Sequence, residues 1–231
     1  MRRRCLIVLL LGLCCSSVGM AQNRPYIDDK TVHFGFSLGV NFMHFTAAES
    51  LLPQEGEIYH ARVSDMLPGF SVGFITDVRL SRHLNLRCTP TLHFGMRTLT
   101  YKSESGNVTN LKTDVLSLPV TLPLYLKWSA EREMNYRPYL LAGGGVSFDF
   151  GTDKQRPILQ KPFDYFVEVG FGCDFYFAWF KLCPQLTYSI GFNNVLTPSD
   201  GRQELPVLDA FYSNALSKLL NRQITLTFNF E

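Results

Sequence analysis

The chain has 231 residues, of which 46% are hydrophobic and 18% charged, and no Pro/Ser-rich or charge-rich linker divides it into separate domains. Its formal net charge is +2, but three of its arginines lie at positions 2–4, and without them the charge is −1. A nearly neutral chain of this kind excludes the strongly basic class of nucleic-acid-binding proteins.

The first 21 residues have the pattern of a cleaved secretory signal. Arginines at positions 2–4 precede an apolar run at 5–15, and Gly19-Met20-Ala21 supplies the small residues that a signal peptidase reads. The run is too short to cross a bilayer as a helix. We therefore predict a signal peptide over 1–21 and one domain over 22–231. A lipoprotein signal ending at Cys14 or Cys15 is the alternative, although Leu13 is bulky where such a signal needs a small residue.

Three cysteines remain after this signal, namely Cys88, Cys173 and Cys183. Their odd number and the absence of a CxxC spacing favour neither a disulfide framework nor a zinc site. We expect them to act as small apolar side chains.

Eight runs of alternating apolar and small or polar residues follow along the chain. Successive side chains of a strand point to opposite faces, so each run predicts a strand with one apolar face. Most runs have about the 9–11 residues with which a tilted strand crosses a bilayer. The runs cover residues 32–42, 70–78, 84–96, 116–128, 138–150, 165–177, 180–192 and 224–230.

The apolar faces of these runs carry no charged residue, so they fit either the core of a soluble β-sandwich or the lipid-facing side of a barrel. The connections decide between them, because they alternate long, short, long, short along the chain. Outer-membrane barrels have long extracellular loops and short periplasmic turns. We therefore predict an all-β fold, an eight-stranded antiparallel up-and-down transmembrane β-barrel in the outer membrane, with both termini periplasmic.

The opposite faces carry charged residues that would point into the lumen, where they can pair across the barrel. An eight-stranded barrel is only wide enough for its side chains, which excludes a protein-conducting channel. The lumen residues form either a structural salt-bridge network or a gated proton or solute path. The predicted lumen network consists of Asp77, Arg87, Arg97, Lys127, Glu168, Asp174 and Lys181, with Gln185 beside it.

The last long connection, residues 193–221, has apolar residues at helix-like spacing, which predicts a short amphipathic helix. Such a helix would cover the barrel mouth, bind a partner or rest on the membrane surface. The first connection, residues 44–68, is a second candidate surface. The candidate partner surface in the last connection consists of Leu208, Phe211, Tyr212, Leu216, Leu219 and Leu220.

Catalytic patterns are absent from the sequence. There is no HExxH or GxSxG motif, and the inward residues His33, His93, Ser71 and Ser117 have no spacing that singles them out. The three glycines at 143–145 fall inside a predicted strand, which favours close strand packing over phosphate binding. We expect a non-enzymatic protein without metal, organic cofactor or small-molecule substrate.

Three segments resemble a known family. They are "KTVHFGFSLGVNFM" (30–43), "LSLPVTLPLYLKW" (116–128) and "YRPYLLAGGGVSFDF" (136–150), and they look like stretches of PorT-like outer-membrane proteins of Bacteroidota. The ending "ITLTFNFE" resembles the signal that barrel-assembly machinery recognises, with Glu231 as an extra final residue. The resemblance implies a component of the type IX secretion system, needed to export cargo such as gingipain-type proteases. Outer-membrane lipid and other type IX components are the implied partners. The alternative is a general small-molecule or lipid-binding barrel.

Overall fold

The computed structural model describes residues 30–49, 59–103, 111–151, 161–196 and 216–231. Within these ranges, no helix is long and apolar enough to cross a membrane. The strands are β1 (Val32–Glu49), β2 (Tyr59–Met66), β3 (Pro68–Arg79), β4 (Leu84–Cys88), β5 (Thr91–Ser103), β6 (Leu111–Ser117), β7 (Pro119–Ser129), β8 (Tyr136–Asp149), β9 (Phe163–Tyr176), β10 (Lys181–Gly191) and β11 (Leu216–Phe230).

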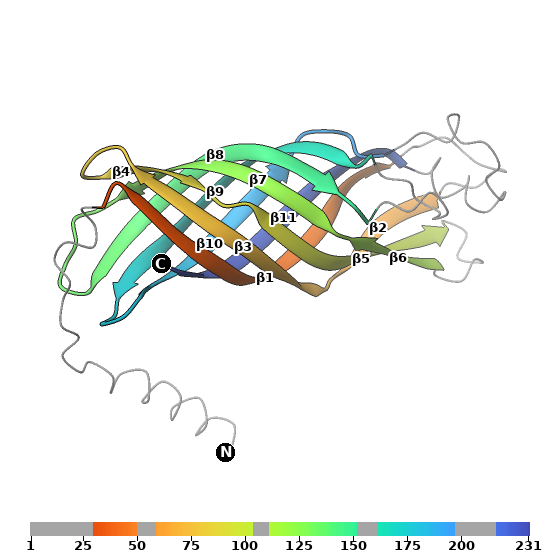
Figure 1. Cartoon of the computed structure of the whole chain (residues 1–231). Coiled ribbons are helices and arrows are strands. Elements are labelled where there is room, and N and C mark those ends of the chain that lie inside the picture. Colours follow the sequence, from red (N-terminus) through yellow and green to blue (C-terminus); the bar gives the residue numbers. More distant parts are fainter. Residues whose placement is uncertain (1–29, 50–58, 104–110, 152–160, 197–215) are drawn as a thin grey trace, which may run out of the picture.

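These segments build a closed antiparallel barrel with eight strand positions in its wall, as predicted (Figure 1). We call each position a stave, whether one strand or two consecutive collinear strands occupy it. Three staves are interrupted, so that β2 and β3, β4 and β5, and β6 and β7 each form one stave. β1 closes the barrel because it pairs with β3 on one edge and with β11 on the other. Neighbouring staves are otherwise consecutive in the chain, which is the up-and-down order.

Proline explains where the staves are interrupted. β3 begins at Pro68, Thr89 and Pro90 separate β4 from β5, and β7 begins at Pro119. Proline has no N–H group to donate to a neighbouring strand, so the ladder loses one hydrogen bond at each of these points. The chain continues in the same direction beyond each break, and the barrel wall stays closed.

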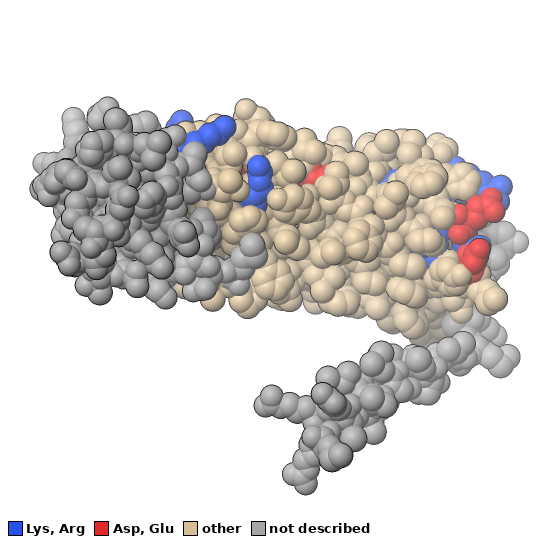
Figure 2. Space-filling model, turned by 180° about the vertical axis from the view of Figure 1, so that it is seen from behind, with Lys and Arg blue, Asp and Glu red and all other residues tan. Residues whose placement is uncertain are grey.

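Burial in this barrel is the reverse of that in a water-soluble protein. Phe34 and Phe171 on the outer surface are 62% and 58% exposed, whereas Asn41 and Arg87 in the lumen are 0% and 1% exposed. Figure 2 shows a broad band of uncharged residues across the face in view, with the visible Lys, Arg, Asp and Glu side chains mostly toward its ends. The apolar faces of the predicted strands therefore point outward, where lipid would cover them.

The two ends of the barrel differ. One carries the short turns, and both described chain ends lie there: the N–H of Arg79 bonds to Thr31, and that of Lys181 bonds to Glu231. Stacked rings mark the outer surface at this end, including Phe177 and Phe180, with centroids 5.1 Å apart. Aromatic side chains at this level are typical of a membrane interface. The long connections lie at the other end.

The strands extend further into the long connections than the sequence predicts. β1 continues to Glu49 and β5 to Ser103, although their apolar alternation stops earlier. Backbone pairing does not require an apolar face, so hydropathy cannot mark where these strands end. The predicted connections 44–68 and 193–221 are correspondingly too long.

The predicted helix in the last connection is wrong where the structure describes it. Leu216, Leu219 and Leu220 belong to β11, in which Leu219 pairs with Ala47 and Leu220 with Thr46 of β1. In β11 the adjacent Leu219 and Leu220 point to opposite faces, and the ladder with β1 determines their conformation. Leu208, Phe211 and Tyr212 lie outside the described residues.

Glycine allows β7 and β8 to lie close together. A Cβ on Gly143 would overlap the carbonyl oxygen of Leu124, and one on Gly145 would overlap that of Leu122. These glycines therefore serve close strand packing, in line with their position inside β8.

The outward-pointing apolar faces of the strands lead to a prediction about Val169. This residue lies midway along β9 and is 49% exposed. Val169→Arg should destabilise the folded barrel in lipid vesicles, lowering its free energy of unfolding by about 2–4 kcal/mol, because it places a charge near the bilayer midplane. Urea titration of the folded protein in vesicles measures this loss. Leu80→Arg is the matched control, since Leu80 lies at a short turn and is 55% exposed. Equal losses in the two variants would contradict a lipid-facing band at Val169.

Candidate functional site

The lumen contains the chemically distinctive residues of the barrel. Strand alternation turns one face of every stave inward, and the sequence places polar residues on that face. Buried polar side chains usually need hydrogen-bond or charge partners, so their arrangement shows what the lumen can do.

Six charged side chains meet in the lumen near the short-turn end. We call Asp77, Arg87, Lys127, Asp174, Lys181 and Glu231 the ion-pair plug. None of their side chains is more than 6% exposed. Three acids and three bases make the plug formally neutral, which a low-dielectric interior favours.

Arg87 on β4 is central to the plug. Its Nε donates to Asp77 Oδ2 at 2.8 Å, and its Nη2 pairs with both Asp77 and Glu231. Glu231 also pairs with Lys181 Nζ. Asn85 donates to the second oxygen of Asp77 at 2.6 Å, so that both carboxylate oxygens are bonded.

The other half of the plug is centred on Asp174 on β9. Lys127 Nζ lies 2.8 Å from Asp174 Oδ2, and Lys181 Nζ lies 3.9 Å from the same oxygen. Lys127 Nζ also lies 4.0 Å from the ring centroid of Tyr139, which adds a cation–π contact.

Gln185 joins the plug to the rest of the lumen. Its Oε1 accepts hydrogen bonds from Tyr139 at 3.1 Å and from Asn229 at 3.2 Å, and Arg87 Nη1 lies 3.4 Å away. The plug and these neutral partners come from every stave except β1. A side chain would have to leave several bonded partners to open the bore at this level.

The structure brings together five of the seven predicted lumen residues, namely Asp77, Arg87, Lys127, Asp174 and Lys181. Glu168 is buried elsewhere in the lumen, where its carboxyl group accepts hydrogen bonds from Tyr125 and Thr187. The side chain of Arg97, on β5, lies outside the described part of the structure.

Sequence reasoning missed Glu231, although its signal was present. Thr225, Thr227 and Asn229 are buried inward-facing residues of β11, and Glu231 continues their period of two. The predicted run ended with the apolar Phe230, which left this lumen carboxylate unassigned.

A second polar group lies further along the lumen and includes two of the residues considered for catalysis. Ser71 Oγ is 2.8 Å from His93 Nδ1, and His93 Nε2 is 3.1 Å from Thr121 Oγ1. Asn41 Nδ2 donates to Ser71 Oγ at 2.7 Å. This geometry suits a His93 tautomer with its proton on Nε2 and Nδ1 accepting from Ser71. Ser71 is 1% exposed, so its oxygen has no open path to a substrate.

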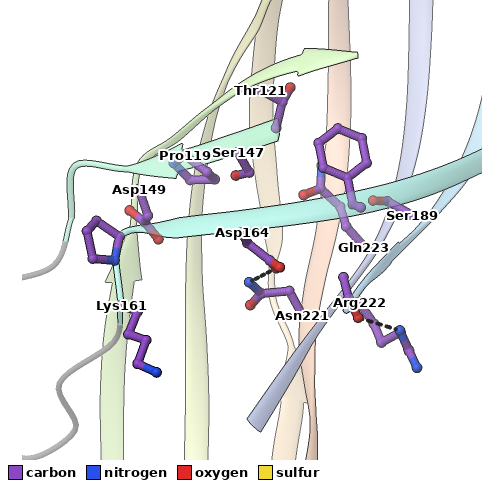
Figure 3. Close-up of a pocket in the computed structure, with 13 residues that line it drawn as sticks. Pro119, Thr121, Ser147, Asp149, Lys161, Asp164, Ser189, Asn221, Arg222 and Gln223 are labelled. Atoms are coloured by element: carbon purple, nitrogen blue, oxygen red, sulfur yellow. Dashed lines mark hydrogen bonds between the residues drawn. The ribbon is translucent and has the colours of Figure 1, made fainter. Parts of the chain in front are cut away.

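Two adjoining polar cavities occupy the lumen beyond the plug. The lower cavity reaches from Gln185 to His93, and the upper cavity lies toward the long connections. They share four lining residues, which are Thr121, Phe166, Ser189 and Gln223. Figure 3 shows the upper cavity, where Asn221 Nδ2 donates to Asp164 Oδ2 at 2.7 Å.

The predicted partner surface is divided by this arrangement. Leu219 is fully buried, and its backbone bonds to Asn194 and Val195, so it offers no surface to a partner. Leu220 is half-buried on the opposite face of β11. The side chain of Leu216 lies outside the described residues, as do Leu208, Phe211 and Tyr212 in full.

The described ranges contain neither a metal-binding cluster nor a disulfide. No group of three or more His, Cys, Asp or Glu residues there could hold a metal ion. Cys88, Cys173 and Cys183 are unpaired thiols, and Cys183 is buried beside Glu231 with its Sγ 3.9 Å from Oε1.

Comparison with known proteins gives one family match. A family model described as an outer membrane protein beta-barrel domain matches residues 20–197. No curated protein matches the chain.

Three solved structures are similar at low sequence identity. Neisserial surface protein A has 9% identity and a TM-score of 0.44, covering 87% of this chain and 98% of that one. OprG from Pseudomonas aeruginosa has 10% identity and a TM-score of 0.44, covering 85% and 92%. AlkL, solved by solid-state NMR in lipid bilayers, has 13% identity and a TM-score of 0.40, covering 92% and 97%.

The contacts within the plug predict that the folding stability of the barrel depends strongly on Asp174. Asp174→Asn leaves Lys127 buried without a carboxylate and should cost about 3–5 kcal/mol of folding free energy. The double variant Lys127→Met with Asp174→Leu should cost clearly less than the sum of its single variants, because it removes both charges. Urea unfolding of the wild type, Lys127→Met, Asp174→Leu and the double variant measures the coupling, and Asp174→Asn is measured beside them.

Glu131→Gln provides the matched control for this cycle. Glu131 pairs with Arg82 at 3.5 Å on the surface, where both side chains are at least 70% exposed. Its loss should change stability little. A similar effect of Asp174→Asn and Glu131→Gln would show that the plug does not hold the staves together.

Proposed function

Because the chain belongs to the family of outer membrane protein beta-barrel domains, we propose that it serves in the outer membrane as a non-conducting, non-enzymatic component of the type IX secretion system. It acts through its rims and connecting segments, with other secretion components as partners. The type IX assignment is supported by the three sequence segments that resemble PorT-like proteins.

The observation that carries the non-conducting role is the ion-pair plug. Six charged side chains and Gln185 fill the bore near one end, and their partners are fixed across the lumen. An eight-stranded barrel also lacks the diameter for a polypeptide. Secreted cargo would therefore have to pass beside this protein, through another component.

The rims supply the surfaces for such a role. At the long-connection end β1, β5 and β11 continue past the apolar band, which gives this rim a paired, extended wall. At the other end, Arg137 donates to the carbonyl groups of Ala130 and Arg82 and so joins two short turns. Each rim thus has a defined backbone on which a partner could dock.

We propose that the short-turn end faces the periplasm. Both described chain ends lie there, and short turns are periplasmic in barrels of this class. This orientation places the long connections and the upper cavity at the cell surface.

The non-enzymatic assignment is supported by the inaccessibility of Ser71. A Ser–His pair can activate a nucleophile, but the attacking oxygen must reach substrate. Here Ser71 is buried against Asn41 and His93, and it does not line either cavity.

The alternative function, a small-molecule or lipid-binding barrel, is favoured by one observation. The two cavities form a polar chamber beyond the plug, with hydroxyl and amide groups on its walls. This alternative predicts a defect in uptake or lipid composition where the secretion role predicts a defect in export.

The secretion role predicts that deletion of the gene stops release of cargo proteases into the medium. A variant with residues 199–213 replaced by a short Gly/Ser linker should insert but fail to restore export, because the rim surface is lost. The double variant Lys127→Met with Asp174→Leu should insert and restore export, because the bore carries no cargo. Cell-free protease activity measures export, and heat-modifiable gel migration measures insertion.

A variant with the same linker in place of residues 152–160 is the comparison for the 199–213 variant. Export by this variant alone would show that the connection at 199–213 has a special role. Export that survives the gene deletion, together with altered permeability or lipid composition, would reject the secretion role and support the binding barrel. Loss of export in an inserted bore variant would reject action through the rims.

A further inference from the structure

The lower cavity of the lumen is lined almost entirely by uncharged oxygen-bearing side chains. Thr89, Thr187, Thr225 and Thr227 belong to its wall, with Gln185 at the plug end. The cavity therefore offers many oxygen ligands and room for a few water molecules or a small ion.

Glu168 is the one acidic side chain on this wall. It projects from β9 and is 9% exposed. Its carboxyl group is hydrogen-bonded by the hydroxyls of Tyr125 and Thr187. Within the described residues no Lys or Arg forms an ion pair with it.

The nearby charged groups leave the Glu168 carboxylate without a fixed counter-ion. Arg87, Lys127 and Lys181 are balanced by the three acids of the plug, and Gln185 stands between Arg87 and the cavity. On the other side, the wall of the upper cavity carries two acids, Asp149 and Asp164, and two bases, Lys161 and Arg222, so its charges balance. Asp164 is bonded by Asn221 and by the backbone of Asn193.

A buried carboxylate without compensation is costly, so it takes up either a proton or a cation. The adjoining space and the ring of hydroxyl oxygens favour a cation, because oxygen atoms are the ligands of alkali-metal and ammonium ions. We propose that the lower cavity binds a small monovalent cation, an alkali-metal ion or a primary ammonium, with Glu168 as its counter-charge.

A divalent ion fits this cavity less well. Calcium sites combine several oxygen ligands with carboxylates, and a single carboxylate balances only one positive charge. In the described part of the chain no three acidic, histidine or cysteine side chains are grouped for a metal. The ligands available in this cavity therefore favour an ion with a single positive charge.

The upper cavity provides the approach to this site. The upper cavity, drawn in Figure 3, shares Thr121, Phe166, Ser189 and Gln223 with the lower one. The plug lies at the opposite end of the lower cavity, next to Gln185. An ion would enter from the long-connection end and stop at Gln185.

Cation titration of the purified barrel in nanodiscs tests the proposal. Potassium, sodium and methylammonium chlorides replace tetrabutylammonium chloride at constant ionic strength, and the urea midpoint is followed. At least one of the three ions should raise the midpoint with saturation in the wild type, and which ion does so distinguishes an alkali-metal from an ammonium site. The rise should be lost in Glu168→Gln and kept in the surface control Glu131→Gln.

A second variant keeps the test decisive if Glu168→Gln folds poorly. Thr225→Lys places a tethered ammonium on the cavity wall, across from Thr187. This variant should lose the cation response and be as stable without the ion as the wild type is with it. Its measurement does not depend on secretion, so it separates this proposal from the secretion role.

Two outcomes would overturn the cation site. One is an equal response, or none, in the wild type and Glu168→Gln for all three ions. The other is a protonated-carboxyl infrared band at neutral pH that Glu168→Gln removes and that no cation displaces. This second result would show that a proton, and not a cation, neutralises Glu168.

Discussion

The pairing of β1 with β11 is the constraint on which the rest of this structure depends. Inside a bilayer an unpaired N–H or C=O group costs several kcal/mol, so a membrane-spanning sheet has to close on itself. β1 meets β11 from Phe36 opposite Phe230 to Glu49 opposite Leu216, and its other edge meets β3. Each stave then has two neighbours, and each side chain points either to lipid or to the lumen. The reversed burial of Phe34 and Asn41 follows from this closure.

Closure also determines the chemistry of the lumen. In a narrow lumen of low dielectric constant, a buried charge costs folding free energy unless it is paired. The plug meets this condition with three acids and three bases. Asp77 and Arg87 face each other on β3 and β4, where the two residues are also partners in the ladder. Backbone register thus places the charges before any side chain adjusts. Glu168 lies outside this balanced set, and its surroundings are hydroxyl groups.

The sequence was sufficient to predict the barrel, because period-two alternation without charges on the apolar face depends on local pattern alone. It was also sufficient to place Asp174 and Lys181 on the inner face. Their pairing with Lys127 and Glu231 could not be predicted, since it depends on the stagger between staves that are distant in the chain. Glu231 was missed because it follows an apolar run, and the helix around Leu219 was wrong because hydropathy does not show that the ladder of β11 with β1 continues to Leu216 opposite Glu49. The end of β1 escaped prediction for a related reason: after Phe42 the outward positions are His44 and Thr46, so the apolar alternation stops although the ladder continues.

The position of the plug makes the lumen directional. Lys181 and Glu231 lie where β10 begins and where β11 ends, so the charged layer closes the short-turn end, while both cavities lie on the other side of it. A solute on the short-turn side meets paired charges held by several staves, and entering would separate them. A solute on the other side first meets an upper cavity whose wall includes Asp149, Asp164, Lys161 and Arg222, and then the hydroxyl and amide groups beside Glu168. Access to the lumen is therefore one-sided, and any ligand of Glu168 reports on the medium at the long-connection end.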